Sequence, residues 1–134
     1  MCGISGEIRR RGDAASAAVT EVISGNLKHR GPDAGGVYAS RNVALGHRRL
    51  AVLDLSPAAD QPMVDPELGL AIAFNGCIYN FRELRTQLEA KGYRFFTDGD
   101  TEVILKSYHA WGPRCVERFK GMFAFAIMER ESGR

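Results

Sequence analysis

The sequence lacks the segments that place a protein in a membrane or direct it to secretion. In 134 residues no apolar run is long enough to cross a bilayer. The opening residues, Met-Cys-Gly-Ile-Ser-Gly, contain neither the charged region nor the apolar region of a signal peptide. These absences predict a cytoplasmic protein without a membrane partner.

Cysteine and histidine are scarce and widely spaced. The three cysteines are Cys2, Cys77 and Cys115, and an odd number so far apart does not make a disulfide framework. Neither they nor the three histidines have the spacing of a metal site. A paired Cys-X-X-Cys is also missing, which disfavours, but leaves open, a thiol redox protein using Cys2 or Cys77. We therefore expect free thiols and no metal in this segment.

Strong net charge is lacking as well. The formal net charge is +2, and the basic residues are scattered apart from Arg9-Arg10-Arg11, which we interpret as a solvated loop. This balance argues against a nucleic-acid partner. The glycines have neither P-loop nor dinucleotide-binding spacing. With 45% hydrophobic and 25% charged residues, the composition is that of one globular domain with a core.

The chain does contain a succession of short apolar runs separated by turn-forming residues. Apolar residues at helical spacing predict helices over 15–28 (through Val19, Val22, Ile23 and Leu27), between Asn80 and Gly92, and over 101–111. Strands are expected at 3–9, 37–39, 43–46, 50–55, 70–74, 93–96 and 122–128. Because many of these strands are neighbours in sequence, we predict an α+β fold with largely antiparallel sheets.

Cap and turn residues separate these elements. Asn80 is expected to cap a helix, with Glu83 in capping-box position. Asp100 is the expected N-cap of the last helix. The pair Asn75-Gly76 is a strong local signal for a hairpin turn. The segment 56–68 contains three prolines and is expected to be a loop.

Cys2 is the first candidate for a catalytic residue. Removal of Met1 would leave a thiol and a free α-amine on one residue. The pKa of an unperturbed α-amine is about 7.7–8.0, so the amine can accept the thiol proton near neutral pH. Nucleophile and base would then need no histidine. The opposite interpretation is that a cysteine at position two has no meaning, because chain termini are commonly disordered.

Six short segments occur in a characteristic order. They are Met-Cys-Gly-Ile at the N-terminus, His29-Arg30-Gly31-Pro32-Asp33, Gly46-His47-Arg48-Arg49-Leu50, Phe74-Asn75-Gly76-Cys77-Ile78-Tyr79-Asn80, Asp100-Thr101-Glu102-Val103-Ile104 and Gly121-Met122-Phe123-Ala124-Phe125-Ala126. Together they resemble the class II glutamine amidotransferase domain, in the asparagine synthetase branch. The resemblance covers essentially the whole chain. It implies the N-terminal-nucleophile fold, an αββα sandwich of two antiparallel sheets.

The same resemblance implies that residues 1–134 are the N-terminal part of such a domain. In the family the domain continues and is followed by an ATP-using synthetase domain, which this sequence does not contain. The run Glu131-Ser132-Gly133 fits this expectation, because it looks like the start of a hairpin whose second strand would follow. ATP and Mg²⁺ are expected in the synthetase domain, and no cofactor is expected in this segment.

A reaction is also implied. Cys2 would attack the side-chain amide of L-glutamine, release ammonia and form a glutamyl thioester that water hydrolyses. The Asn75 side-chain amide and the Gly76 N–H would stabilise the oxyanion, where one preorganised donor contributes roughly 3–4 kcal/mol. The ammonia would pass to the synthetase domain of the same chain for ATP-dependent amide formation. Without the resemblance, an Asn-Gly turn would be the preferred interpretation of these two residues.

Two charged residues would recognise the ends of free glutamine. Arg49 corresponds to the arginine that grips the α-carboxylate through two parallel hydrogen bonds. Asp100 corresponds to the aspartate that pairs with the α-ammonium. Each has a simpler alternative, Arg49 as a surface residue entering a strand and Asp100 as a helix cap. The residues expected to line the same pocket are Leu50, Ala51, Val52 and Leu53.

Cys77 departs from the family pattern, which has glutamate after Asn-Gly. A substrate contact through the Cys77 backbone carbonyl would survive this exchange, whereas a contact through the side chain would not. As a second nucleophile Cys77 has no base of its own in the sequence. The run Asn-Gly-Cys-Ile-Tyr-Asn is more similar to relatives that amidate an N-acetylglutaminylglutamine dipeptide, which is an alternative acceptor. The segment 29–33 is expected to order the loops around the site.

A further alternative comes from another class of protein. The chain could be a non-catalytic domain used in docking or regulation, and retention of Met1 would favour this, because a blocked amine cannot act as a base. The sequence leaves the ammonia acceptor open. A homodimer is compatible with it.

Overall fold

Strands and helices follow one another in an order that builds two separate sheets. The computed structural model describes residues 1–10 and 12–132. Its elements are β1 Gly3–Ile8, α1 Ala17–Gly25, β2 Ala34–Ser40, β3 Val43–Arg49, η1 Pro57–Ala59, β4 Met63–Asp65, β5 Leu70–Ile78, α2 Phe81–Ala90, α3 Asp100–Trp111, η2 Gly112–Arg118 and β6 Gly121–Glu129. The two η elements are short 3-10 helices.

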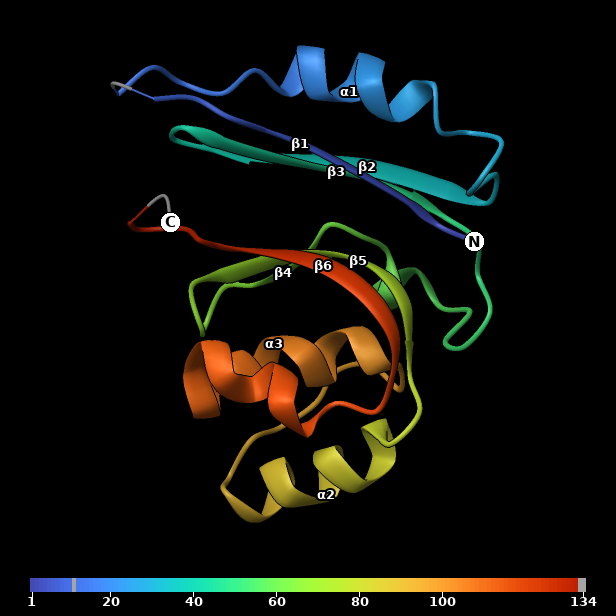
Figure 1. The fold of residues 1–134 in the computed structure, drawn as a ribbon, viewed down its shortest axis with the longest axis vertical. Helices are drawn as coiled ribbons and strands as arrows, with labels where there is room; N and C mark the ends of the chain where they lie inside the picture. Colours follow the sequence, from blue (N-terminus) through green and yellow to red (C-terminus); the bar gives the residue numbers. More distant parts are fainter. Residues whose placement is uncertain (11, 133–134) are drawn as a thin grey trace.

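Both sheets are antiparallel. The first has the strand order β1-β3-β2, and the second has the order β4-β5-β6. In Figure 1 the layers run from α1 through the first sheet and the second sheet to α3 and α2. This αββα arrangement confirms the predicted α+β class with two antiparallel sheets.

Two apolar cores hold the layers together. The smaller core lies between the sheets and is built by Val43 and Leu45 of β3, Ala71 and Ala73 of β5, and Met128 of β6. The larger core lies between the second sheet and the helices α2 and α3. Its fully buried side chains include Ile72, Ile78, Leu84, Leu88, Ile104 and Leu105. Since side chains alternate between the two faces of a strand, β5 contributes to both cores.

Helix α1 contacts the first sheet through small polar side chains. Thr20 and Ser24 are its buried residues, and a side chain in place of Gly46 would collide with Ser24. The hydroxyls of Ser24 and Ser5 share a hydrogen bond of 2.6 Å. The exposed side chains of this helix include Val19, Val22 and Ile23. The apolar residues that predicted this helix therefore do not form its buried face, because the close approach at Gly46 admits only small residues.

Two segments that were expected to be strands are loops. In each of them a backbone group hydrogen-bonds to a buried side chain instead of to a neighbouring strand. The segment 50–55 follows β3, and one of its carbonyls accepts a hydrogen bond from Arg49. The segment 93–96 precedes α3, and its Phe96 N–H donates to the Glu102 carboxylate at 3.0 Å. Backbone groups that find side-chain partners need no strand ladder. Sequence periodicity does not reveal such partners.

The second sheet is larger than the sequence pattern predicts. Strand β4 lies inside the segment 56–68, which was expected to be a loop. Strand β5 runs through Asn75-Gly76 to Ile78, and both residues pair with β6, so the predicted hairpin turn is wrong. Gly76 has φ +152°, and a side chain there would collide with the backbone of Met122. Glycine is required here by the close approach of β6, not by a turn.

Helix starts agree with the predicted positions, but their caps differ. The Asn80 side chain makes no capping hydrogen bond to α2. It accepts from the Lys120 N–H at 2.9 Å and donates to the Arg118 carbonyl at 3.0 Å, which fastens the segment before β6 to the start of α2. The N-cap of α3 is Gly99, and Asp100 is its first helical residue. Both predicted caps therefore have other partners.

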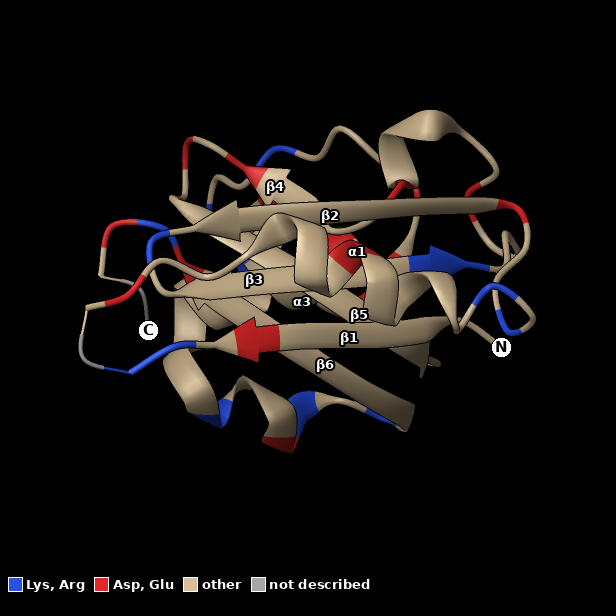
Figure 2. Cartoon of the chain, turned by 90° about the horizontal axis from the view of Figure 1, so that it is seen from above, with Lys and Arg blue, Asp and Glu red and all other residues tan. Residues whose placement is uncertain are grey.

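Many charged residues belong to loops and to the ends of helices and strands. Seen from the α1 side, lysines and arginines are mixed with aspartates and glutamates, many of them in loops and near strand ends (Figure 2). The turn after β6 contains Glu131 and Ser132. Gly133, predicted to belong to the same turn, and Arg11 of the basic triplet lie outside the described residues. Within the described chain, no helix has the length and hydrophobicity required to cross a membrane.

Candidate active site

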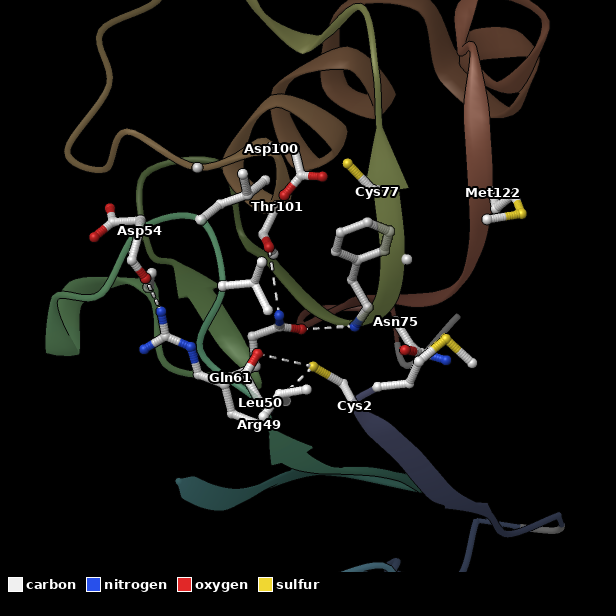
Figure 3. Close-up of a pocket in the computed structure, with 17 residues that line it drawn as sticks. Cys2, Arg49, Leu50, Asp54, Gln61, Asn75, Cys77, Asp100, Thr101 and Met122 are labelled. Carbon is white, nitrogen blue, oxygen red and sulfur yellow. Dashed lines mark hydrogen bonds between the residues drawn. The ribbon is translucent and has the colours of Figure 1, made fainter. Parts of the chain in front are cut away.

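A cavity opens where the N-terminus, the loop after β3, strand β5 and the start of α3 meet. Its volume is about 310 Å³, at the lower end of the range of about 300–1,000 Å³ for small-molecule pockets. Figure 3 shows its side chains. It is lined by Met1, Cys2, Arg49, Leu50, Val52, Leu53, Asp54, Ala59, Gln61, Phe74, Asn75, Gly76, Cys77, Gly99, Asp100, Thr101 and Met122. All predicted site residues except Ala51 are in this lining.

Cys2 directly precedes β1, and the register of that strand brings it beside the end of β3. Gly3 pairs with Arg48, so Cys2 lies next to the residues that follow in the chain. The Leu50 N–H donates to Cys2 Sγ at 3.3 Å, and the thiol donates to the Leu50 carbonyl at 3.7 Å. The half-buried sulfur is thus held at the cavity wall by one peptide unit on each side of Leu50 (Figure 3).

The segment 29–33 supports this end of the cavity from behind. Arg30 Nε donates to the Cys2 carbonyl at 3.2 Å. A side chain in place of Gly31 would collide with the Arg48 backbone, so the segment lies directly against β3. The Asp33 carboxylate accepts from the Ala51 N–H at 2.9 Å. These contacts fit the predicted role of ordering loops, and they account for Ala51, whose N–H faces Asp33 and whose side chain lies outside the cavity lining.

Strand β5 turns one edge toward the cavity. In an antiparallel pair, alternate residues direct their N–H and C=O groups away from the partner strand. Two of these, Phe74 and Ile78, donate their N–H groups to Gln61 and Asp100. Gly76 lies midway between them, so its N–H faces the same side, and the Asn75 side chain enters the cavity from the adjacent position. The strand therefore presents the predicted oxyanion donors in extended backbone.

Asp100 brings a carboxylate into the cavity from the first turn of α3. It is 4% exposed, and its Oδ2 accepts from the Ile78 N–H at 2.9 Å. Burial raises the pKa of Asp100 above its ordinary value, although the nearby N–H groups of Ile78, Asp100 and Thr101 lower it in part. A buried carboxylate of this kind is stabilised by a cation. The cavity thus contains a site suited to an ammonium group.

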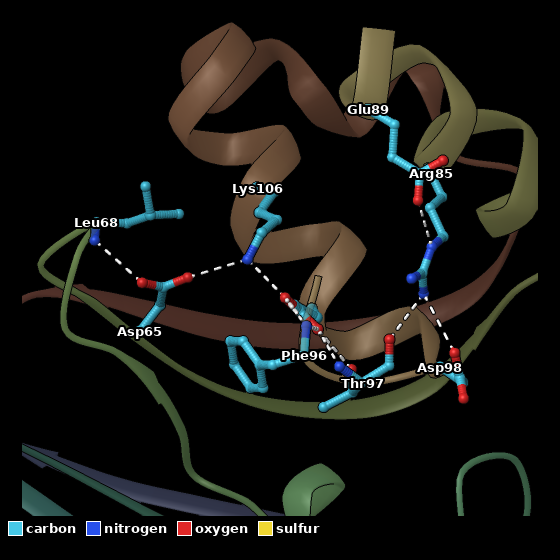
Figure 4. A network of polar contacts seen from close by, with 9 residues as sticks. Asp65, Leu68, Arg85, Glu89, Phe96, Thr97, Asp98 and Lys106 are labelled. Carbon is cyan, nitrogen blue, oxygen red and sulfur yellow. Dashed lines mark hydrogen bonds and ion pairs between the residues drawn. The ribbon is translucent and has the colours of Figure 1, made fainter. Parts of the chain in front are cut away.

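A buried ion network fixes the loop that leads into Asp100. Lys106 Nζ lies 2.5 Å from the Glu102 carboxylate and 3.1 Å from that of Asp65 (Figure 4). Glu102 accepts in turn from the N–H groups of Phe96 and Thr97 at 3.0 and 2.7 Å. The carboxylate of a helix residue therefore organises the segment just before the helix, and with it the placement of Asp100.

Arg49 lies on the opposite wall and is 7% exposed. Its guanidinium donates to the carbonyls of Asp54 and Ser56 and pairs with the Asp60 carboxylate at 2.7 Å. A guanidinium has five N–H donors, so these three contacts leave capacity for an anion. In Figure 3 Arg49 points toward Asp54, on the side of the loop. Arg49 therefore lines the cavity and is not the surface residue of the alternative, while its contact with an α-carboxylate stays a prediction.

The residues after Arg49 line the cavity from a loop instead of a strand. Leu50 is half-buried, whereas Val52 and Leu53 are exposed. Asp54 joins this loop to the one before α3, because its carboxylate accepts from the Asp98 N–H at 2.9 Å and from the Ser56 N–H at 2.8 Å. A hydrogen bond from the Ser56 side chain lowers the Asp54 pKa, and the two N–H groups lower it further. The two loops that frame the cavity are therefore connected.

Cys77 lines the same cavity and lies beside Asp100 (Figure 3). Burial raises the pKa of the Cys77 thiol, and the negative charge of Asp100 raises it further. Cys77 therefore remains a protonated thiol at neutral pH. This state agrees with the expectation that it is not a second nucleophile.

Sequence reasoning missed several residues of the cavity. They include Asp54, Gln61, Phe74, Thr101 and Met122. Phe74, Thr101 and Met122 occur inside the motif segments and could have been proposed as neighbours of Asn75, Asp100 and Gly121. Asp54 and Gln61 come from segments whose structure the sequence pattern did not predict.

The profile of one family matches the whole chain, residues 1–134, and that family is described as a glutamine amidotransferase domain. The chain belongs to the glutamine amidotransferase domain family. This amidotransferase domain is 40% identical over 133 residues to asparagine synthetase 1 (glutamine-hydrolyzing) of Bacillus subtilis (strain 168), a match that covers 97% of this chain and 21% of the relative. It is 39% identical over 132 residues to asparagine synthetase B (glutamine-hydrolyzing) of Escherichia coli (strain K12), covering 98% of this chain and 24% of the relative. The domain thus spans about a fifth to a quarter of the length of these relatives.

A solved structure has the same fold. Glutamine phosphoribosylpyrophosphate (PRPP) amidotransferase from B. subtilis, complexed with ADP and GMP, matches 97% of this amidotransferase domain and 35% of its own chain, with a TM-score of 0.77 and 24% identity. At this level of identity the likeness concerns the fold alone. It agrees with the N-terminal-nucleophile sandwich that the six segments implied.

Proposed function

We propose that this chain is the glutaminase part of a glutamine-hydrolysing, ATP-dependent amide ligase that resembles asparagine synthetase. The observation that carries the proposal is that Cys2, the Asn75-Gly76 pair, Arg49 and Asp100 line one cavity of about 310 Å³. Hydrolysis of free glutamine needs a nucleophile, donors for an oxyanion and groups for both charged ends of an amino acid. The cavity offers candidates for each.

The nucleophile is Cys2 after removal of Met1. While Met1 is attached, the Cys2 nitrogen belongs to a peptide bond and cannot accept a proton. Met1 itself lines the cavity and is 72% exposed. Its removal would create the α-amine beside the sulfur and clear space in front of it. The amine then serves as the general base.

The reaction proceeds in two stages. The thiol gives its proton to the α-amine, and the sulfur forms a bond to the side-chain amide carbon of glutamine. The oxyanion of this intermediate accepts hydrogen bonds from the Asn75 side chain and the Gly76 N–H. The proton passes to the leaving nitrogen, the C–N bond breaks, and ammonia and a γ-glutamyl thioester result. Water then attacks the thioester, releasing glutamate and the thiol.

Recognition of the substrate uses the two charged walls. The Asp100 carboxylate pairs with the α-ammonium, and Arg49 donates to the α-carboxylate. A glutamine residue within a peptide lacks both charges, so this arrangement selects the free amino acid. Leu50, Val52 and Leu53 supply apolar surface between the two ends.

The ammonia serves a synthetase domain elsewhere in the same polypeptide. The curated relatives are named glutamine-hydrolyzing asparagine synthetases and are four to five times as long as this chain. ATP and Mg²⁺ would bind in that domain, outside residues 1–134.

The decisive experiment replaces the nucleophile in the protein as it is naturally encoded. Cys2→Ala should abolish glutamine hydrolysis and glutamine-dependent amide formation, while amide formation from added ammonium salts continues. Equal loss of both activities would refute the assignment of Cys2.

Two measurements separate the proposal from a docking module. Intact mass of the expressed protein should show that Met1 is absent. A glutamine-analogue electrophile should label one residue, and peptide mapping should place the label on Cys2. Retained Met1 together with an unlabelled Cys2 would favour the non-catalytic alternative.

A further inference from the structure

Strand β5 is held beside the cavity by side chains where its neighbouring strand has ended. Strand β4 begins only at Met63, which pairs with Ile72, so the edge of β5 at Phe74 has no strand partner on that side. The Phe74 N–H instead donates to Gln61 Oε1 at 2.6 Å. The Phe74 carbonyl accepts from His47 Nε2 at 2.9 Å. Two side chains thus substitute for a strand immediately before Asn75.

Gln61 also reaches the helix that carries Asp100. It is 8% exposed and lines the cavity, and its Nε2 donates to Thr101 Oγ1 at 3.4 Å (Figure 3). Thr101 is buried and follows Asp100 in the first turn of α3. One amide group therefore contacts the strand of the oxyanion donors and the helix of the ammonium site.

Side-chain hydrogen bonds hold strand β5 on both sides of the segment that contains the proposed oxyanion donors. Residues 75–77 lie between Phe74, which Gln61 and His47 hold, and Ile78, which donates to Asp100 at 2.9 Å. The neutral amide has an acceptor for the Phe74 N–H and a donor for the Thr101 hydroxyl oxygen, so it connects the two. Loss of the acceptor would also leave a buried N–H unpaired.

We propose that Gln61 is a positioning residue that fixes Asn75 and Gly76 for oxyanion stabilisation and couples them through Thr101 to the Asp100 site. This inference rests on the proposed function. Gln61 acts through its two contacts and takes no part in bond making. A displacement of reacting groups by about 1 Å can lower a rate by about 100-fold, so a residue in this place has a kinetic effect.

The test uses three variants of the naturally encoded protein, assayed for glutamine hydrolysis. Gln61→Leu has a similar size but no polar atoms, and it should lower kcat by about 10- to 100-fold with a smaller rise in KM. Thr101→Val keeps the shape and removes the hydroxyl, so it should raise KM about three- to tenfold and leave kcat nearly unchanged. Thr101→Ser keeps the hydroxyl and should restore the parental KM.

A second measurement distinguishes positioning from general damage. The rate at which iodoacetamide alkylates Cys2 should be the same in the parent and in all three variants, because the sulfur is held by Leu50 and not by Gln61. A loss of kcat in Gln61→Leu that is matched by a changed alkylation rate would mean that only stability was affected, and would overturn the proposal.

The outcomes also separate this inference from the proposed function. If Cys2→Ala still hydrolyses glutamine, the proposed function fails. If hydrolysis depends on Cys2 but Gln61→Leu has parental kcat and KM, only the role of Gln61 fails. Should Gln61→Leu not fold, the Thr101 pair decides, and equal KM values for Thr101→Val and Thr101→Ser would overturn the coupling.

Discussion

The two ends of the cavity consist of different kinds of chemical group. At the reaction end, the groups are a thiol, a side-chain amide and a backbone N–H, all formally neutral, from Cys2, Asn75 and Gly76. At the recognition end, Arg49 and Asp100 bring opposite formal charges that are almost completely buried. At the reaction end, Asn75 and Gly76 lie in β5 and Cys2 directly precedes β1, whereas Arg49 is fixed by a loop and Asp100 begins a helix.

This difference predicts which kinetic constant each end of the cavity affects. Neutral donors in a strand can be fixed in advance for a charge that develops only during the reaction, and they therefore affect kcat. A buried charge such as that of Asp100 is costly until a ligand of opposite charge arrives, whereas Arg49 already pairs with Asp60 and keeps donors for an anion, so both charges affect binding. Substitutions at the two ends should separate cleanly into changes of kcat and changes of KM.

Among substitutions that keep the Cys2 nucleophile, the largest effect is expected from Asn75→Ala. Removing one oxyanion donor lowers kcat by about 10²- to 10³-fold in comparable sites, and KM for glutamine should change little. Steady-state hydrolysis of glutamine measures both constants. Asn42→Ala is a suitable control, because Asn42 donates to the Arg9 carbonyl at 3.1 Å, away from the cavity. A rise in KM at constant kcat would place Asn75 at the recognition end instead.

The second prediction concerns His47, which supports the reaction end through its bond to Phe74. Burial lowers the pKa of His47 to about 4 from 6.5, with a further contribution from the charges of Arg49 and Arg48. Between these pH values the unfolded chain binds a proton that the folded chain does not. The free energy of unfolding should therefore fall as pH decreases from 6.5 to 4, by up to about 3 kcal/mol, and be flat above 6.5 with respect to this group.

Urea unfolding at pH 7, 5.5 and 4.5 measures the slope of the free energy of unfolding against pH. His47→Gln can still donate to a carbonyl but does not titrate, so the slope of the parent minus that of the variant isolates the histidine. Equal slopes in the two proteins would show that His47 is protonated in the fold, and the interpretation of a neutral Nε2–H donor to Phe74 would then be wrong.

The contrast between the two ends also explains what could be predicted from the sequence. The reaction end depends on residues inside strands, and the motif around Asn75 identified them even though the local Asn-Gly signal indicated a turn. That turn was wrong because the sequence does not show the approach of β6 to Gly76.

The recognition end was harder to predict because its loops depend on tertiary contacts. The segment 50–55 has the β-branched and apolar composition of a buried strand, yet Arg49 and Asp54 hold it as a loop. The segment 93–96 is fixed by Glu102 in the same way. Gln61 was missed for a related reason, since its partners Phe74 and Thr101 are distant in sequence and no local pattern connects them.

The third prediction tests how the buried charge of Asp100 affects substrate affinity and the stability of the fold. Asp100→Asn should raise KM for glutamine about ten- to hundredfold, because a hydrogen bond to a charged group contributes about 1.5–3 kcal/mol. It should also raise the melting temperature of the ligand-free protein at neutral pH. The pKa of Asp100 is raised by burial, so this carboxylate stabilises the fold when protonated and loses that contribution as pH rises.

Asparagine at position 100 can still accept from the Ile78 N–H but carries no charge, which is why stability and affinity should change in opposite directions. Asp98→Asn is the matched control, since its side chain is 97% exposed in the same segment. A lower melting temperature in Asp100→Asn would show that the carboxylate is already compensated in the ligand-free protein.

The smallest effect is expected from Cys77→Ser, at the boundary between the two ends. The Cys77 thiol is protonated at neutral pH, because burial and Asp100 both raise its pKa, so it neither competes as a nucleophile nor adds a charge to the ammonium site. Serine has a similar size and should leave kcat and KM within about twofold of the parent. Stoichiometric labelling by a glutamine-analogue electrophile should still occur once per chain, at Cys2. A large loss of activity with intact labelling would mean that the sulfur of Cys77 contacts the substrate, and the recognition end would then include a neutral group as well as its two charges.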